Sequence, residues 1–288
     1  MTFFRFIAVV VICWHAFPGV GVCAAVGQPT ATIGWQLLEP GLELGSAPVG
    51  APGDAPGDAP GDAQMTSAAI TILRIDPAKF AFSLHMSSEK GPKSIAAIGR
   101  DESLVAAVNA GMYLPDHRTS TGHLRSATHT NNPRVAANFG AFFVAEPRVK
   151  SLPLARVLDR NRDDWQTALQ EYDLVMQNYR MTTPDGRIIW KQADRPHSIA
   201  ALSQDSAGKV LFLLCADPVP AEEFIRAVLR LPLDAKAIMY LEGGSEAALL
   251  IRSGAVDKVE AGRYPSGLWG GSSELLLPNV LGVTRRGE

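Results

Sequence analysis

The sequence contains little cysteine and no excess of positive charge, and both features limit what the protein can be. Only three cysteines occur in 288 residues, namely Cys13, Cys23 and Cys215. The first two lie in a segment that we expect to be removed, so the remaining thiol cannot form an internal disulfide. The fold must therefore rely on an ordinary hydrophobic core. A formal net charge of −2 provides no basic field for binding nucleic acid.

Long apolar runs are also scarce, apart from one at the N-terminus. Residues 1–25 combine one arginine, an apolar stretch and small residues at Ala24 and Ala25, which is the pattern of a secretory signal peptide. A buried N-terminal helix is the alternative. No later run reaches membrane-spanning length, so we expect a secreted or periplasmic protein without an integral membrane span. Lipid attachment at Cys23 stays open, although the preceding valine is bulky for such a site.

One low-complexity segment interrupts the chain. The tetrapeptide APGD occurs three times between Ala51 and Asp62, and its prolines and glycines block both helix and sheet. This composition predicts a flexible surface loop over residues 46–64. The preceding residues 34–45 have the pattern of a short strand pair, which is not stable alone. We therefore interpret the repeat as a loop within one domain spanning 26–288, rather than as a linker.

Apolar patterning predicts a chain of strands with a few helices. Residues 68–77 and 81–86 are expected to form two strands of a hairpin or meander, and residues 140–146 another strand. A polar segment over 113–138 is longer than loops that merely connect two elements, and loops of this length are usually functional or disordered. Residues 160–177 have helical spacing, with these side chains on one face: Trp165, Leu169, Tyr172 and Met176.

The last third of the chain predicts a βαβ unit. Residues 197–204 and 208–216 are expected to form a hairpin, and the segment 220–231 begins with proline and two acids, as helices often do. The inward positions of this helix are Phe224, Ile225, Val228 and Leu229. A strand over 237–241 follows, so the strands ending at Cys215 and Leu241 should run parallel. We expect an α/β (α+β) single domain whose central mixed β-sheet is flanked by helices.

Polar residues gather where these strands end. Asp217 and Glu242 follow the two parallel strands, and the start of the hairpin carries Arg195 and His197. Ligand-binding sites lie beyond the carboxyl ends of parallel strands. If the strand preceding Asn109 points the same way, two carboxylates, an imidazole, a guanidinium and an amide face one crevice.

Each of these residues also has an ordinary structural interpretation. Glu242 with Gly243 and Gly244 fits an exposed turn at a strand end, although the glycines also offer unobstructed N–H groups to a ligand. Asp217, which precedes a proline, fits the turn into the next helix. His197 fits a surface histidine. Only their inferred convergence favours a site.

Several other chemistries fit poorly. Gly243-x-Ser245 is not a nucleophile elbow, because such hydrolases need a histidine after the serine and His197 is the last one. A dyad of Cys215 with His197 is conceivable, but a thiol in an apolar strand favours inert core. No phosphate-binding glycine loop occurs, and we expect neither a metal nor a cofactor. The three loop histidines match no familiar ligand spacing: His117, His123 and His129.

Five short segments, in this order, resemble the phosphodiester glycosidase family. They are VNAGMY, DLVMQNYRMTTPDGRI, RPHSIAAL, YLEGGSEAAL and LPNVLGV, and the likeness runs from about Trp35 to Val283. The family's bacterial members are exported proteins, and an animal relative removes N-acetylglucosamine from a phosphodiester-linked mannose. The resemblance implies cleavage between the anomeric carbon of a sugar and a phosphate.

The resemblance also implies roles for residues that match the family's motifs. Glutamate at 242 stands where aspartate is commoner, and His197 stands where many relatives have arginine, which leaves Arg195 or Arg180 for phosphate. Asn109 and Gly111 match the family's Asn-x-Gly motif, and Glu242, Gly243 and Gly244 match its Asp-Gly-Gly motif. With the strand-end residues added, the candidate catalytic residues are Glu242, Asp217 and His197. The candidate substrate-binding residues are Asn109, Gly111, Tyr113, Arg180, Arg195, Gly243, Gly244 and Ser245.

Two functions remain open at this point. The first is an exported hydrolase that acts on a carbohydrate phosphodiester, with Glu242 as nucleophile or as base for water. The second is a non-catalytic exported protein that binds glycans or cell-wall fragments in the same crevice. Another hydrolase on the same fold, a phosphodiesterase or an amidase, is a weaker third.

Overall fold

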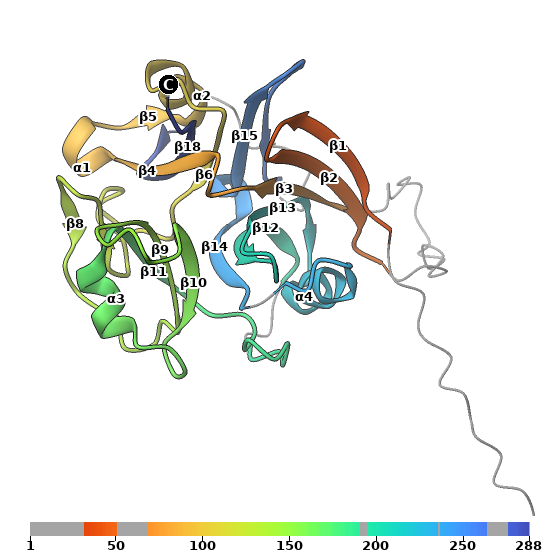
Figure 1. Cartoon of the computed structure of the whole chain (residues 1–288). Coiled ribbons are helices and arrows are strands. Elements are labelled where there is room, and N and C mark those ends of the chain that lie inside the picture. Colours follow the sequence, from red (N-terminus) through yellow and green to blue (C-terminus); the bar gives the residue numbers. More distant parts are fainter. Residues whose placement is uncertain (1–31, 51–67, 191–194, 236, 264–275, 288) are drawn as a thin grey trace, which may run out of the picture.

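The computed structural model describes residues 32–50, 68–190, 195–235, 237–263 and 276–287. Strands dominate and form three main sheets (Figure 1). Sheet I has the order β1-β2-β3-β13-β12-β14, sheet II the order β10-β9-β11-β7-β8, and sheet III the order β16-β15-β6-β18-β4, while β5 pairs with β17. The strands are β1 Gly34–Glu39, β2 Leu42–Pro48, β3 Ala69–Ile75, β4 Phe80–Met86, β5 Lys93–Ser94, β6 Ala106–Asn109, β7 Leu124–Arg125, β8 Thr130–Asn132, β9 Ala141–Pro147, β10 Ala155–Asp159, β11 Tyr172–Asn178, β12 His197–Gln204, β13 Val210–Val219, β14 Met239–Gly243, β15 Ala248–Ser253, β16 Val256–Ala261, β17 Leu276–Leu277 and β18 Asn279–Arg285.

The three sheets share one central core. Phe82 of β4 contacts Phe143 of β9 edge to face, with ring centroids 5.3 Å apart, and lies 6.4 Å from the ring of Phe212 of β13. Each sheet therefore contributes one of these buried aromatic rings. Such pairs add about 0.5–1.5 kcal/mol each to the burial of apolar surface.

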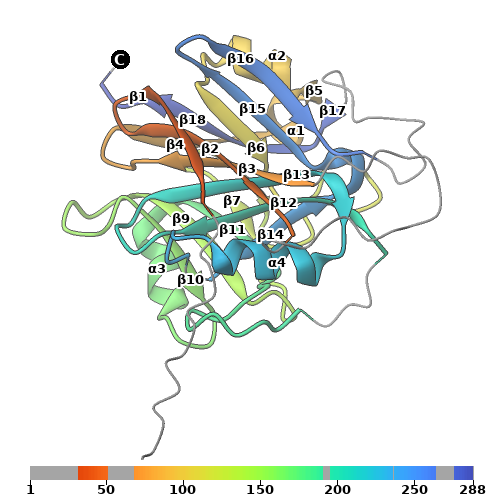
Figure 2. The same cartoon turned by 90° about the vertical axis from the view of Figure 1, so that its right-hand side faces the viewer.

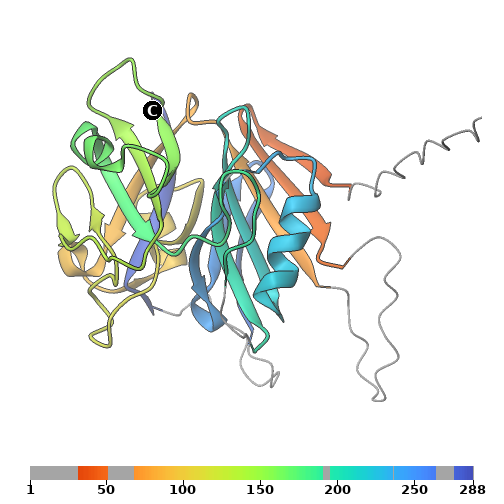
Figure 3. The same cartoon turned by 90° about the horizontal axis from the view of Figure 1, so that it is seen from below.

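Each sheet carries a helix on its outer face (Figures 2 and 3). Helix α4 (Ala221–Arg230) covers sheet I, α2 (Ile95–Asp101) covers sheet III and α3 (Trp165–Glu171) covers sheet II. A short α1 (Ser87–Lys90) follows β4. The predicted helix over 220–231 is confirmed, since Phe224, Ile225 and Val228 are buried beneath α4 and Leu229 packs partly buried beside them.

The prediction of a mixed sheet is wrong, because every strand pair within the described ranges is antiparallel. The direction inferred for the βαβ unit is nevertheless confirmed. Strand β12 pairs antiparallel with both β13 and β14, so those two run parallel to each other with β12 inserted between them.

Two local predictions are also wrong. Strands form at residues 69–75 and 80–86, but β3 pairs in sheet I and β4 in sheet III, so they make no hairpin. The helix expected over 160–177 ends at Glu171, and Tyr172 and Met176 belong to β11. That strand is buried on both faces, and its apolar residues therefore also fit a helical period.

The strand pair expected over 34–45 is confirmed as β1 and β2. Strands β2 and β3, on either side of the APGD repeat, pair directly. The loop predicted over 46–64 begins too early, because Ser46, Ala47 and Pro48 still pair with β3 as part of β2. Residues 51–67, which include the repeat, and the expected signal peptide over 1–25 lie outside the described residues. Within the described ranges, no helix is long and apolar enough to cross a membrane.

Candidate active site

Glu242 lies where the chain passes from sheet I to sheet III. Strand β14 ends at Gly243, a single 3-10 turn spans Gly244–Glu246, and β15 begins at Ala248 in the other sheet. Gly244 has a φ of +68°, which a residue with a Cβ rarely adopts, so the change of direction requires glycine there. The register of β12 on β14 shifts just before Glu242, and such a bulge redirects the side chain that follows it.

The carboxyl group of Glu242 is electrostatically unusual. Its pKa is raised to about 7, chiefly because burial removes the carboxyl group from water. A hydrogen bond from the Gly243 N–H opposes this rise, and the negative charge of Glu246 adds to it. That N–H lies 3.1 Å from Glu242 Oε1. A carboxyl group with this pKa exchanges a proton near neutral pH, as acid–base catalysts do.

Two asparagines hold the segment that carries Glu242. Asn178 Nδ2, at the end of β11, donates to the carbonyl oxygen of Leu241 at 3.0 Å. Asn109 Oδ1, at the end of β6, accepts from the Ala248 N–H at 3.1 Å. Gly111, with a φ of +84°, lets the chain pass Asn178, because a Cβ there would lie 3.0 Å from Asn178 Nδ2. All three sheets therefore meet around Glu242.

The expectation that one sheet edge supplies the crevice is corrected by this arrangement. Asn109 comes from sheet III, whereas His197, Asp217 and Glu242 come from sheet I. The structure links Asn109 to the segment that follows Glu242, because β14 continues into β15, β15 pairs with β6 and Asn109 accepts from the Ala248 N–H.

His197 lies directly beside the turn. Its Nδ1 is 2.9 Å from the Arg195 carbonyl oxygen, and since a carbonyl only accepts, Nδ1 carries the proton. The His197 ring also approaches Tyr240, with centroids 6.4 Å apart. The side chain of Arg195 is exposed.

Asp217 lies on the other side of β12. Its Oδ1 accepts from Arg263 Nη1 at 2.8 Å. Because neighbouring strands are about 5 Å apart, the backbone of Asp217 lies roughly 10 Å from β14. Arg263 stays 61% exposed, and its neighbour Gly262 packs so closely on the turn that a Cβ there would lie 1.9 Å from the Gly244 oxygen. The exposed guanidinium of Arg263 is therefore a cation near this turn that sequence analysis did not single out.

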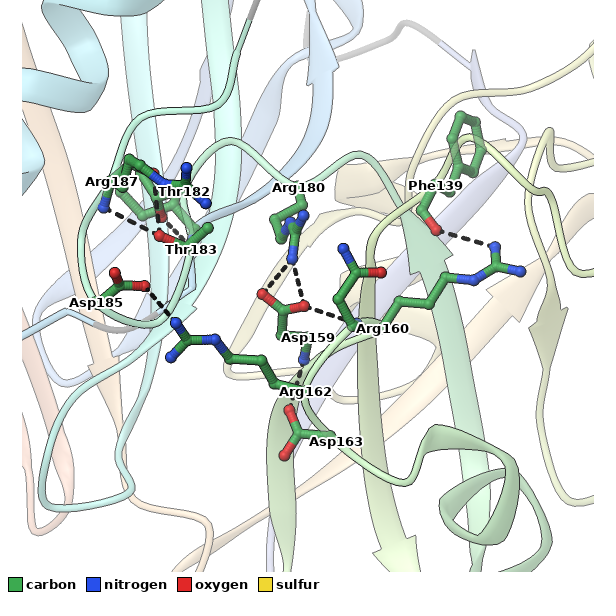
Figure 4. Close-up of polar contacts among 12 residues, drawn as sticks. Phe139, Asp159, Arg160, Arg162, Asp163, Arg180, Thr182, Thr183, Asp185 and Arg187 are labelled. Atoms are coloured by element: carbon green, nitrogen blue, oxygen red, sulfur yellow. Dashed lines mark hydrogen bonds and ion pairs between the residues drawn. The ribbon is translucent and has the colours of Figure 1, made fainter.

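The side chain of Arg180 points toward Asp159. Its Nη1 donates to both carboxylate oxygens of Asp159, a residue with no exposed surface at the end of β10 (Figure 4). A substrate contact by Arg180 stays a prediction, and it would have to compete with this ion pair.

Tyr113 and Ser245 both contact Glu246. The Tyr113 hydroxyl donates to Glu246 Oε1 at 3.4 Å, and Ser245 Oγ donates to Oε2 at 2.8 Å. Glu246 and Asn178 were not predicted as site residues, although both fall in segments that resemble the family. The signal available was a second carboxylate four residues after Glu242.

The other chemistries considered from the sequence receive no support from geometry. Burial raises the pKa of the Cys215 thiol to about 12, which makes it a poor nucleophile. His117 lies against the Tyr113 ring, and His129 Nε2 is 2.9 Å from Ser88 Oγ. The part of the chain that the structure describes contains no group of three or more His, Cys, Asp or Glu side chains suited to a metal.

Replacing Gly243 by alanine should destabilise the protein by about 1–3 kcal/mol, as overpacking does. The added Cβ would lie 2.5 Å from Tyr240 Oη, 2.6 Å from His197 Cδ2 and 3.0 Å from the Ser198 carbonyl oxygen. Urea unfolding measures the effect. Gly34→Ala is the control, since nothing lies within 4 Å of its added Cβ. Equal losses in the two variants would show that the turn tolerates the methyl group.

Known proteins share this fold. A hypothetical protein from Synechocystis has a TM-score of 0.61 and 12% identity, covering 88% of this chain and 64% of that one, so the chain spans less than two thirds of its length. The catalytic domain of zebrafish N-acetylglucosamine-1-phosphodiester alpha-N-acetylglucosaminidase, auto-inhibited by its pro-peptide, has a TM-score of 0.55 and 12% identity, covering 90% of this chain and 89% of that one. No curated protein matches the sequence. The sequence model of the phosphodiester glycosidases matches residues 102–284, well over half of the chain, and we conclude that the chain belongs to the phosphodiester glycosidase family.

Proposed function

We propose that this protein is an exported hydrolase that cleaves the bond between C1 of a sugar and the oxygen of a phosphodiester. The observation that carries the proposal is Glu242, a carboxyl group with a pKa of about 7 at the junction of sheets I and III. Family membership supports the reaction class. The products would be a free sugar and a phosphomonoester.

The chemistry requires a base more than an acid. When the C1–O bond breaks, its electron pair passes to the phosphate oxygen, and this anionic leaving group needs no proton. A water oxygen then bonds to C1 and gives its proton to the Glu242 carboxylate. The raised pKa makes that carboxylate a stronger proton acceptor than an ordinary one. Attack by Glu242 itself on C1 is the alternative route, and it also requires the ionised form.

Other groups of the crevice have supporting roles in this proposal. Arg263, held by Asp217, supplies a partly exposed guanidinium for the phosphate, and Arg195 offers a second. Asp217 would then act by orienting Arg263, and not as the second catalytic carboxylate that the sequence suggested. His197 would offer Nε2 as a hydrogen-bond acceptor, because Nδ1 donates to the Arg195 carbonyl oxygen.

Binding of a neutral glycan without turnover is the second candidate. It is favoured by the closeness of Glu246 to Glu242, since two carboxylates repel a phosphodiester. In this alternative, half-buried Trp190, whose ring centroid lies 5.1 Å from that of Tyr240, would contact the sugar.

The decisive experiment incubates the purified protein with a panel of sugar-1-phosphodiesters in ¹⁸O-labelled water, with and without chelator. Mass spectrometry identifies the products. We expect free sugar together with a phosphomonoester that carries no ¹⁸O, which requires C–O cleavage. Label in the sugar decides nothing, because the anomeric oxygen of a free sugar exchanges with water. Label in the phosphate would mean P–O cleavage and a phosphodiesterase, and saturable binding without product would support the glycan-binding candidate.

Activity should rise with pH through about 7 and then level off. Both routes need ionised Glu242, so below its pKa of about 7 the active fraction falls by about tenfold per pH unit. The measurement is kcat/KM between pH 5 and 9. Glu246→Gln removes the charge that raises this pKa, so the midpoint should move to lower pH. A profile that falls with rising pH would identify Glu242 as an acid instead.

A further inference from the structure

A cavity lies at the end of sheet III remote from Glu242. Strand β15 begins at Ala248, beside the candidate site, and ends at Ser253, which lines this cavity of about 400 Å³. Strand β18 likewise ends here, at Arg285. The two sites are thus separated by the length of the strands. The lining residues used below are Arg100, Leu104, Val105, Arg252, Val256 and Arg285.

Three arginines from three elements line the cavity: Arg100 of α2, Arg252 of β15 and Arg285 of β18. Arg285 is neutralised by Glu39, with Nε–Oε2 and Nη2–Oε1 distances of 2.6 and 3.0 Å. The other two are compensated far less.

Nearby carboxylates compensate the charges of Arg252 and Arg100 only weakly. Arg252 Nε lies 3.5 Å from Asp257, whose side chain is 73% exposed, so water screens this pair. Among the described residues, no carboxylate lies within ion-pair distance of Arg100, and its neighbour Asp101 pairs with Lys93 instead. Glu39 thus offsets Arg285, whereas Asp257 offsets Arg252 only weakly.

Packing fixes where Arg252 lies. Helix α2 approaches β15 so closely that a Cβ on Gly99 would lie 2.3 Å from Leu250 Cδ2 and 3.6 Å from Arg252 Cδ. The aliphatic part of Arg252 is therefore held beneath the helix, next to the position that precedes Arg100. Apolar side chains of Leu104, Val105 and Val256 form other walls.

We propose that this cavity binds a small molecule through a phosphate or carboxylate group, with Arg100 and Arg252 as the principal ligands. Guanidinium groups match the planar, bidentate geometry of such oxyanions. A cavity of about 400 Å³ admits a molecule of metabolite size. The site is independent of the proposed hydrolysis.

Isothermal titration calorimetry with inorganic phosphate and, separately, with malonate tests the proposal, with ionic strength kept constant by sodium chloride. We expect saturable binding of at least one anion, weakened at least tenfold in the double variant Arg100→Gln/Arg252→Gln. The matched control is Arg226→Gln, which removes another exposed arginine, on α4. It should bind as the wild type does, and so should Glu242→Gln.

The two anions separate phosphate from carboxylate recognition. Absence of saturable binding, or an unchanged Kd in the double variant, would overturn the proposal. Binding lost in Arg263→Gln but kept in the double variant would place the anion beside Glu242 instead. Should the double variant fail to fold, Arg100→Gln alone decides, since its side chain is exposed.

Discussion

Replacing Glu242 by glutamine should lower kcat/KM on a sugar-1-phosphodiester by roughly 10²–10⁴-fold, the contribution of a positioned acid–base group. Glutamine fills the same space but cannot accept a proton or attack C1. Steady-state kinetics on the substrate found by product analysis gives the value. Glu242→Asp keeps the charge and shortens the reach by one methylene, so it should retain more activity than the glutamine variant. Full activity in Glu242→Gln would remove this residue from the mechanism.

Glu242→Gln should also change the free energy of unfolding, and measuring this change shows whether the variant folds. The pKa of Glu242 is raised from 4.5 to about 7 in the folded protein, so folding favours the protonated form. The stability this provides is fully present below pH 4.5 and lost as pH rises through 7. By linkage at 1.36 kcal/mol per pH unit, Glu242→Gln should be more stable than wild type by up to about 3 kcal/mol at pH 8.5.

At pH 4 the two proteins should be equally stable, because wild-type Glu242 is then protonated in both states. Partial exposure of the side chain makes the figure an upper limit. Urea unfolding at the two pH values measures the difference. An equal difference at both pH values would mean that the carboxyl group titrates normally.

The second large effect concerns the buried ion pair of Asp159 with Arg180. Asp159 has no exposed surface, and besides Arg180 its Oδ1 accepts from the Asn161 N–H at 2.8 Å. Asp159→Ala would leave the guanidinium of Arg180, only 14% exposed, without its counter-charge. Removing one partner of a buried pair costs about 3–5 kcal/mol, so we expect a loss of this size in the free energy of unfolding.

The matched control is Asp185→Ala. Asp185 pairs with Arg162 at 3.1 Å, but both side chains are more than half exposed (Figure 4). Exposed pairs contribute about 0–1 kcal/mol, so its loss should be small. A double variant Asp159→Ala/Arg180→Ala should recover part of the loss, since it leaves no unpaired charge. If Asp159→Ala and Asp185→Ala cost the same, Arg180 reaches solvent easily and is available to a ligand.

Local patterns predicted the elements whose residues face water on one side or are joined by short connections. The hairpin of β12 and β13 and the buried face of α4 follow from apolar spacing, and the parallel course of β13 and β14 follows from the helix between them. The pattern misled at β11, where both faces are buried. Strand pairing across a long separation has no local signal, so β3 and β4 looked like partners.

The residues of the candidate site likewise fall into those that the sequence could predict and those that it could not. Glu242, Asn109 and His197 could be named from the sequence because each polar residue ends or begins an apolar strand. The partners of Arg180 and Asp217 could not, because Asp159 and Arg263 approach them only through the packing of distant segments.

By itself, the sequence determined the strands of sheet I, the turn at Gly243 and Gly244 and the family of the chain. Only the tertiary structure decided that the Glu242 carboxyl keeps its proton up to about pH 7. That property depends on the water excluded by neighbouring sheets and on the charge of Glu246, which are features of three-dimensional proximity and not of residue order.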